Sequence, residues 1–383
     1  MTRKRARELG IPCGVLPTGV HNAITDVAGV LVGHCTLHEG DNCTGVTAIL
    51  PHEGNLFQEK VVAAVHVLNG FGKSIGLSQI MELGQLETPI MLTGTLSAPK
   101  VADALISWML KHDESITSIN AVVGECNDSF LDDIRSRALT EEHVFAALNM
   151  AAGAVVAEGA VGAGAGMTAY GYKGGIGTAS RLLPSELGGY TVGILVLANF
   201  GAPRDLLIGG IPVGRLLQTP LPGVASAGSA PTPSSFGFVN HDQSDEADHL
   251  GDGSIMMILA TDAPLSSRQL GRLAKRPPLG LARTGAVASH GSGDYVIAFS
   301  TAERLPHTRP GESSSVRQAL RLYEDGRLLT ALFSAAVEAT EEAIYNSLCM
   351  AKETTGFKGN TRSALPLEQV VQILRDHNRI QEV

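Results

Sequence analysis

Short apolar runs bounded by Gly, Pro and Asn recur along the chain, and many are rich in β-branched residues. They predict strands over residues 29–34, 45–50, 61–67, 190–198, 254–260, 285–288 and 295–299. The run Ser254-Ile-Met-Met-Ile-Leu-Ala260 is continuous rather than alternating, which is typical of a strand buried on both faces.

Helical spacing of apolar residues begins after Ser97, where Val101, Ala104, Leu105, Trp108 and Met109 form one stripe. A second helix is expected from Thr140, because two glutamates in its first turn suit the helix dipole, and it is expected to run through Val155. Three further helices are predicted over residues 314–323, 328–351 and 367–376. Strands clustered at both ends of the chain, with helices after each cluster, indicate sheets covered by helices.

The segment over residues 219–253 has a different composition, with four prolines among Gly and Ser followed by an acidic, histidine-containing stretch. A connection of about thirty residues without a regular pattern is unusual inside a compact domain and is usually functional or disordered. We therefore expect a flexible linker that ends where the strand at Ser254 begins.

Charge and cysteine content narrow the class of protein. The 29 Lys and Arg against 38 Asp and Glu give a net charge of −9, which argues against a nucleic-acid binder. Five scattered cysteines without a C-x-x-C pair encode neither a disulfide framework nor a zinc site. No secretory apolar run follows the basic start, and the most apolar long stretch, 146–167, contains Asn149 and Glu158. The expectation is a cytoplasmic protein without metal, membrane or nucleic-acid partners.

Two serines are candidate nucleophiles, and the first lies in Ser97-Ala-Pro-Lys100. This segment matches the S-x-x-K pattern of penicillin-binding enzymes. The S-D-N and K-T-G partners of that pattern are missing. A serine that caps the following helix, with a proline in the first turn, fits the segment better.

The second candidate is Ser254, between the acidic linker and a buried strand. Breaking the Gly253–Ser254 bond would free the serine's α-amine beside its own hydroxyl. That amine has an ordinary pKa of about 7.7–8.0, which suits a general base better than a lysine near 10.4. Taken alone, Gly251-Asp-Gly-Ser254 is more typical of a turn before a strand.

Several segments taken together favour a catalytic role for Ser254 over a simple turn. They are Asn22-Ala-Ile-Thr-Asp-Val27, Gly29-Val-Leu-Val-Gly-His34, Asn69-Gly-Phe-Gly-Lys73, Glu87-Thr-Pro-Ile90, Gly162-Ala-Gly-Ala-Gly-Met167, Lys173-Gly-Gly-Ile-Gly-Thr-Ala-Ser-Arg181, Ala198-Asn-Phe-Gly201, Gly253-Ser254, Ala260-Thr-Asp-Ala-Pro264 and His290-Gly-Ser-Gly-Asp294. In this order, over about residues 12 to 350, they resemble the family of L-aminopeptidase D-Ala-esterase/amidase and the β-peptidyl aminopeptidases.

The resemblance implies one catalytic domain over residues 1–383, self-cleaved at Gly253–Ser254 into an α chain of 1–253 and a β chain of 254–383. It implies an α/β (α+β) fold, a four-layer αββα sandwich like that of N-terminal nucleophile hydrolases but with different strand connectivity. The implied assembly is a homo-oligomer, a tetramer of αβ units. The implied activity is release of N-terminal L-, D- or β-aminoacyl residues from short peptides, amides or esters, without a cofactor.

The resemblance also implies roles for single residues. Ser254 matches the nucleophile, Ser292 and Asp294 match the pair that orients its amine, and Asn199 matches an oxyanion-hole donor. Some family members have Glu where Asp294 stands, so its reach toward the amine differs.

Two residues are implied in substrate binding. Glu125 matches the carboxylate that holds the substrate's ammonium, and Asn127 stands where an aromatic residue is expected in some relatives. Three alternatives stay open: an ornithine/glutamate-type N-acetyltransferase, which should use threonine, a Ser97–Lys100 acyl enzyme, and a non-catalytic assembly protein.

Overall fold

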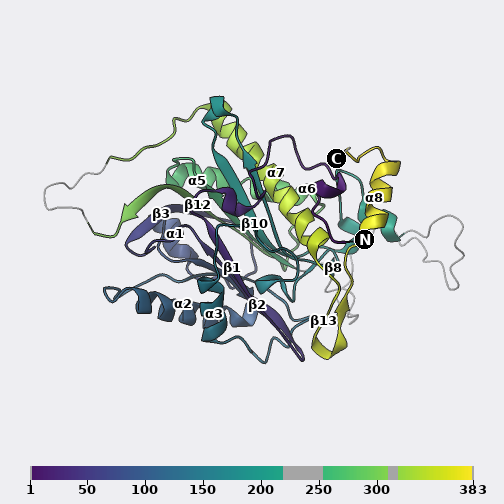
Figure 1. The fold of residues 1–383 in the computed structure, drawn as a ribbon, viewed down its shortest axis with the longest axis horizontal. Helices are drawn as coiled ribbons and strands as arrows, with labels where there is room; N and C mark the ends of the chain where they lie inside the picture. The colour runs from purple at the N-terminus through teal and green to yellow at the C-terminus, as the bar shows by residue number, and fades with distance from the viewer. Residues whose placement is uncertain (1, 219–252, 309–317, 382–383) are drawn as a thin grey trace, which may run out of the picture.

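Two β-sheets form the centre of the protein in a computed structural model that describes residues 2–218, 253–308 and 318–381 (Figure 1). The smaller sheet consists, in order, of β1 (Leu31–Glu39), β2 (Asn42–Leu50), β5 (Ile90–Gly94) and β6 (Val122–Cys126). The larger sheet consists, in order, of β4 (Gln85–Leu86), β3 (Glu59–Gly70), β12 (Gly293–Pro306), β11 (Ser254–Thr261), β10 (Thr191–Asn199) and β9 (Gly175–Leu182). The pairs β5–β6 and β11–β12 are parallel and the other neighbours antiparallel.

Helices cover the outer face of each sheet. On the smaller sheet lie α2 (Ala98–His112) and α3 (Glu141–Asn149). On the larger sheet lie α5 (Ser267–Ala274), α6 (Pro277–Arg283) and α7 (Gly326–Met350), and α8 (Leu367–Asp376) joins the same apolar cluster. The remaining short elements are α1 (Leu77–Leu83), α4 (Val213–Gln218), and the strand pairs β7 (Thr168–Ala169) with β8 (Tyr172–Lys173) and β13 (Thr354–Thr355) with β14 (Thr361–Arg362). Within the described ranges, no helix is both long and apolar enough to cross a membrane.

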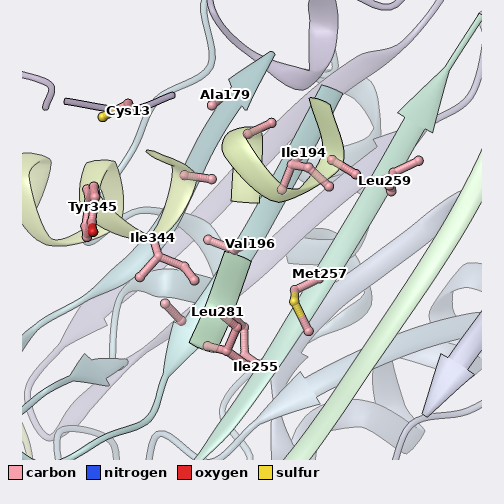
Figure 2. Packing of buried hydrophobic residues seen from close by; sticks show 14 of the residues in the cluster. Cys13, Ala179, Ile194, Val196, Ile255, Met257, Leu259, Leu281, Ile344 and Tyr345 are labelled. Carbon is pink, nitrogen blue, oxygen red and sulfur yellow. The ribbon is translucent and has the colours of Figure 1, made fainter. Parts of the chain in front are cut away.

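The alternation of side chains along β11 shows how the layers are built. Ile255, Met257 and Leu259 point into the apolar cluster beneath the helices (Figure 2). Met256 and Ile258 point the other way, into the cluster between the two sheets. Since successive side chains of a strand face opposite sides, a strand covered on both faces is apolar throughout. The predicted buried strand and the predicted four-layer αββα sandwich are therefore confirmed.

The predicted helices at the centre and the end of the chain are present, but the helix from Thr140 is shorter than expected. It ends at Asn149 rather than continuing through Val155. Beyond it, Val32 and Ala152 exchange two backbone hydrogen bonds of 3.1 Å. The chain therefore leaves the helix because it pairs with β1.

Two predicted elements are absent from the part of the chain that the structure describes. Residues 285–288 form a loop rather than a strand, because Gly285 and Ala288 have φ values of 97° and 50°, and Val287 is 81% exposed. Residues 318–323 are not helical, and Leu320 lies exposed. Residues 314–317 of that predicted helix and 219–252 of the predicted linker lie outside the described residues.

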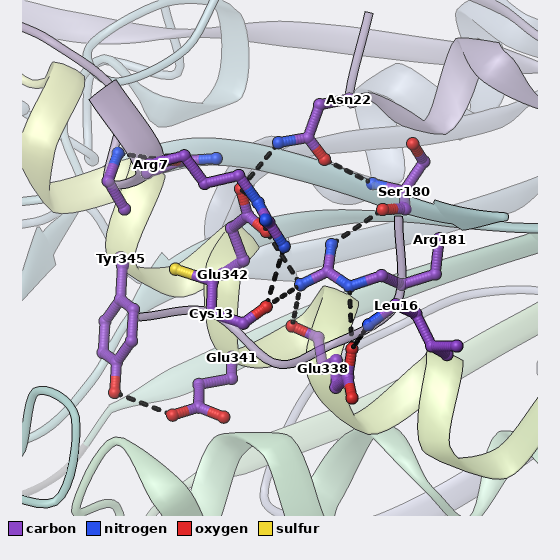
Figure 3. Close-up of polar contacts among 12 residues, drawn as sticks. Arg7, Cys13, Leu16, Asn22, Ser180, Arg181, Glu338, Glu341, Glu342 and Tyr345 are labelled. Carbon is purple, nitrogen blue, oxygen red and sulfur yellow. Dashed lines mark hydrogen bonds and ion pairs between the residues drawn. The ribbon is translucent and has the colours of Figure 1, made fainter. Parts of the chain in front are cut away.

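A buried ionic cluster joins the N-terminal arm, β9 and α7 (Figure 3). The Arg181 guanidinium lies 3.1 Å from the Glu338 carboxylate and 2.8 Å from that of Glu342, and Arg7 lies 2.9 Å from Glu342. Arg181 also donates to the carbonyl oxygen of Cys13. Its side chain is fully buried, and the paired carboxylates balance its charge.

Candidate active site

Ser254 is the first residue of β11, at the middle of the larger sheet. Its register partners are Asn199, the last residue of β10, and Gly293, the first residue of β12. Three strand ends therefore meet at the predicted nucleophile. Ser254 is 8% exposed and opens onto a cleft of about 910 Å³.

Two glycines surround the Gly253–Ser254 bond. The Gly293 N–H donates to the Gly253 carbonyl oxygen at 3.1 Å and to the Ser254 hydroxyl oxygen at 3.2 Å. A Cβ on Gly253 would lie 2.4 Å from the Asn199 carbonyl oxygen, and one on Gly293 would lie 3.1 Å from the Ser254 hydroxyl. The site therefore has no room for a side chain at Gly253, and one at Gly293 would press on its neighbours. The hydroxyl and the preceding carbonyl oxygen share one donor.

Ser292 and Asp294 form a buried pair beside β11. The Ser292 hydroxyl donates to Asp294 Oδ1 at 2.6 Å, and the backbone N–H of Ile255 also bonds to the Asp294 carboxylate. Burial raises the pKa of Asp294 to about 6, although both donors favour its anion. Within the described residues, Oδ2 has no hydrogen-bond partner, and neither side chain bonds to Ser254 itself. The pair lines a second cavity of about 220 Å³ rather than the cleft.

The Asn199 side chain is held in one orientation. Its carbonyl oxygen accepts the Thr168 N–H at 2.8 Å, and its amide donates to the Asn127 carbonyl oxygen at 2.9 Å. An amide has two N–H groups, and the described residues give an acceptor to one of them. The other is on a residue that lies in register with Ser254 and lines the cleft. Such a donor can stabilise an oxyanion formed at the serine.

Glu125 lies in β6 of the smaller sheet and is only 2% exposed. Its carboxylate accepts the Lys73 N–H at 2.6 Å and the Thr95 hydroxyl, and it lines the cleft. Among the described residues, no cationic side chain pairs with it. A buried carboxylate without a countercharge is suited to bind an ammonium group from a ligand.

Asn127 contributes to the site through its backbone rather than its amide. Its carbonyl oxygen anchors Asn199, while its side-chain oxygen accepts the Ser129 N–H at 3.0 Å in a local turn. The residue lines the cleft and is exposed.

Several cleft residues were not predicted from the sequence. Thr95 and Thr168, which hold Glu125 and Asn199, lie far from them along the chain. Segments 69–73 and 162–167, which the sequence analysis singled out, lie next to these contacts. However, no spacing rule in the sequence connects the segments to Glu125 or Asn199. A wall of the cleft also comes from the β13–β14 hairpin, through Phe357, Lys358, Asn360 and Arg362.

The Ser97–Lys100 pair does not form a site. Ser97 is buried at the start of α2 and makes no capping hydrogen bond, although Pro99 lies in the first turn as expected. Lys100 donates to the Arg137 carbonyl oxygen at 2.6 Å, and neither residue lines the cleft. This geometry does not support activation of Ser97 by Lys100.

Comparison with known proteins shows the family of the chain. The model of peptidase family S58 matches residues 22–362. Over 98% of its length, the chain is 39% identical to the beta-peptidyl aminopeptidase BapA of Sphingosinicella microcystinivorans, covering 93% of that protein. The crystal structure of the PH0078 protein from Pyrococcus horikoshii matches with a TM-score of 0.86 and 45% identity, over 98% of this chain and all of that one. The L-aminopeptidase D-Ala-esterase/amidase of Ochrobactrum anthropi, described as a new variant among the Ntn hydrolase fold, matches with a TM-score of 0.85 and 34% identity, over 98% and 99% of the chains.

Proposed function

The chain belongs to peptidase family S58 and is a serine aminopeptidase, and from that premise we propose that it processes itself at Gly253–Ser254 and acts through the freed Ser254. The observation that carries the proposal is the arrangement at the start of β11. There the Ser254 hydroxyl and the Gly253 carbonyl share the Gly293 N–H, opposite Asn199 and on a cleft that contains Glu125.

Self-cleavage begins with the Ser254 hydroxyl oxygen attacking the Gly253 carbonyl carbon. The Gly293 N–H stabilises the oxyanion, the C–N bond breaks, and the proton of the hydroxyl passes to the departing nitrogen. Water then hydrolyses the ester, which leaves a carboxylate on Gly253 and a free amine on Ser254. The close packing around Gly253 and Gly293 supports this step, because the two oxygens stay close to one donor.

In peptide hydrolysis the freed amine is the general base. It takes the proton of its own hydroxyl, and the oxygen attacks the substrate carbonyl while the free N–H of Asn199 stabilises the oxyanion. The ammonium then protonates the leaving amine, and water releases the acyl group from Ser254. The unpartnered Oδ2 of Asp294 supports a role in orienting the amine, together with Ser292.

Glu125 selects substrates with a free N-terminus. Its carboxylate is buried and its described neighbours supply only uncharged donors, so an ammonium group from the substrate completes its interactions. Substrates are therefore short peptides, amides or esters with an unblocked L-, D- or β-aminoacyl group.

We also propose that the protein assembles as a tetramer of αβ units and is located in the cytoplasm. Light scattering after size-exclusion chromatography tests the tetramer.

Two serine variants test the proposed nucleophile. Ser254→Ala should abolish hydrolysis of aminoacyl p-nitroanilides, because it removes the attacking oxygen. Ser97→Ala, a matched change outside the cleft, should retain the wild-type rate. An active Ser254→Ala protein would refute the proposal, and loss of activity only in Ser97→Ala would favour the Ser–Lys alternative.

A further inference from the structure

The charges around the cleft are unbalanced. Among the described residues, one carboxylate, Glu125, lines the cleft together with three cationic side chains, Lys73, Lys358 and Arg362. This excess of positive charge occurs in a chain whose net charge is −9. In the described part of the chain, none of the three cations forms an ion pair with a carboxylate, so the cleft has unused positive charge.

Lys73 belongs to the Glu125 end of the cleft, because its N–H donates to that carboxylate. Its ammonium is already engaged, since it donates to the Phe71 carbonyl oxygen at 3.4 Å and lies 4.7 Å from the centre of the Phe71 ring. The two cations without a hydrogen-bond acceptor among the described residues are therefore Lys358 and Arg362.

Both of these cations lie on the β13–β14 hairpin, which is fixed to the wall of the cleft. The Phe357 N–H donates to the Leu131 carbonyl oxygen at 2.7 Å, and the Asn360 amide donates to that of Phe130 at 2.8 Å. The Lys358 N–H donates to the Asp41 carboxylate at 3.0 Å. Three contacts to other segments therefore hold the hairpin in place.

The Arg362 guanidinium is preorganised. Its central carbon lies over the Phe130 ring, 3.5 Å from the ring centre, and this contact limits the rotation of the side chain. Its Nε is buried and lacks a partner among the described residues. A guanidinium held in this way can pair with a carboxylate through two parallel N–H donors.

We propose that Lys358 and Arg362, on the hairpin wall of the cleft, bind the C-terminal carboxylate of a short peptide substrate. The inference rests on the proposed function, in which Glu125 holds the ammonium and Ser254 attacks the peptide. The cleft then recognises both charged termini of one peptide. Its volume of about 910 Å³ lies within the range of small-ligand sites, about 300–1,000 Å³, which suits a peptide of a few residues.

The test compares each peptide with its C-terminal amide, which lacks the negative charge. The measured quantity is the ratio of kcat/KM for the free acid to kcat/KM for the amide, over peptides of two to four residues. The wild-type ratio should reach about ten for the best length, the equivalent of about 1.4 kcal/mol. Arg362→Met should reduce this ratio to about two and Lys358→Met/Arg362→Met to about one. Arg362→Lys, which keeps the charge but loses the paired donors, should give an intermediate ratio.

Lys352→Met is the matched control, because it removes an exposed lysine that does not line the cleft. It should leave the ratio at the wild-type value. Lys358 is itself exposed, so Lys358→Met alone should fold normally and lower the ratio even if an Arg362 variant fails to fold.

The outcomes separate this inference from the proposed function. A wild-type enzyme that cleaves acids and amides equally well, or an Arg362→Met ratio equal to that of the wild type, would overturn the inference alone. Activity in Ser254→Ala would overturn the proposed function. A third set of peptides, amidated but with Glu in the leaving part, identifies the source of the carboxylate. Faster cleavage of these than of the free acids would overturn the assignment to the C-terminus.

Discussion

Gly293 determines how the reactive oxygens of Ser254 and Gly253 are placed, because its N–H bonds to both and its missing Cβ leaves them room. An added Cβ would lie 3.0 Å from Gly72 Cα and 3.1 Å from the Ser254 hydroxyl. Backbone atoms of β12 would have to move to relieve the first contact.

Gly293→Ala should therefore slow self-cleavage and lower kcat by about 10²-fold or more, since small displacements of reacting groups cost rates of that order. Denaturing electrophoresis against time measures the uncut fraction. Gly326→Ala is the control, because a Cβ there meets nothing within 4 Å. Equal processing of the two variants would contradict the assigned role of Gly293.

The pH dependence of kcat/KM tests the proposed role of Asp294. We propose that in the processed protein the Asp294 carboxylate orients the Ser254 amine. An anion in that position would stabilise the ammonium and raise the pKa of the amine. Since the base works only when unprotonated, Asp294→Asn should lower that pKa and shift the acidic limb of the kcat/KM profile to lower pH by about one unit. The rate on the plateau should fall as well. A lower plateau with an unshifted limb would indicate that Asp294 has only a structural role.

At this scale the sequence pointed to the candidate catalytic residues, but not to the residues that hold them in place. Ser254, Asn199 and Asp294 lie in segments with recognisable order along the chain. Thr95, Thr168 and Arg362 are ordinary residues in sequence, and only the packing of distant segments brings them to the cleft. No local pattern encodes such contacts.

At the scale of elements, the best predictions came from strands and helices whose apolar residues are buried. The run over 254–260 became β11, and the stripe from Val101 to Met109 became the inner face of α2. The strand predicted over 285–288 is a loop, because Val287 faces solvent and the left-handed backbone at Ala288 prevents an extended strand.

The β7–β8 hairpin holds the glycine-rich segment before Thr168 in place, a role that the hydrophobic pattern and the motif spacing of the sequence did not predict. Lys173, at the end of β8, is fully buried and donates to the carbonyl oxygens of Gly164, Met167 and Gly174 at 2.8 to 2.9 Å. It thereby fixes the glycine-rich segment that leads to Thr168, the residue that orients Asn199.

Lys173→Met should leave three buried carbonyl oxygens without a donor and destabilise the protein by about 3 kcal/mol or more. Denaturant unfolding followed by circular dichroism measures this loss. Lys352→Met, an exposed change of the same kind, should alter stability by no more than about 0.5 kcal/mol. Equal stability of the two variants would show that the hydrogen bonds of Lys173 are dispensable.

At the scale of the whole molecule, the predicted cleavage site divides the chain but not the sheet. Strands β11 and β12 follow the site, yet in the sheet they lie between β3 and β10, which precede it. The cluster of Arg181 with Glu338 and Glu342 also connects a residue before the site to residues after it (Figure 3). The two chains should therefore elute together after processing and separate only on unfolding.

Arg181→Met should weaken this association. It leaves the two carboxylates of Glu338 and Glu342 with Arg7 as their one cationic partner among the described residues, and breaking such a buried pair costs about 3–5 kcal/mol. Differential scanning calorimetry should show a clearly lower Tm. Arg268→Met removes a paired but exposed arginine and should change Tm little. A Tm in Arg181→Met equal to that in Arg268→Met would argue against the cluster as a stabilising contact.

The most direct test of the central claim is the intact mass and N-terminal sequence of the purified active protein. Self-processing at Gly253–Ser254 should give two chains of residues 1–253 and 254–383, the second beginning Ser-Ile-Met-Met, and Ser254→Ala should remain a single uncut chain. A fully active wild-type protein that remains one chain of 383 residues would contradict it, because the Ser254 nitrogen would still be an amide and could not accept a proton.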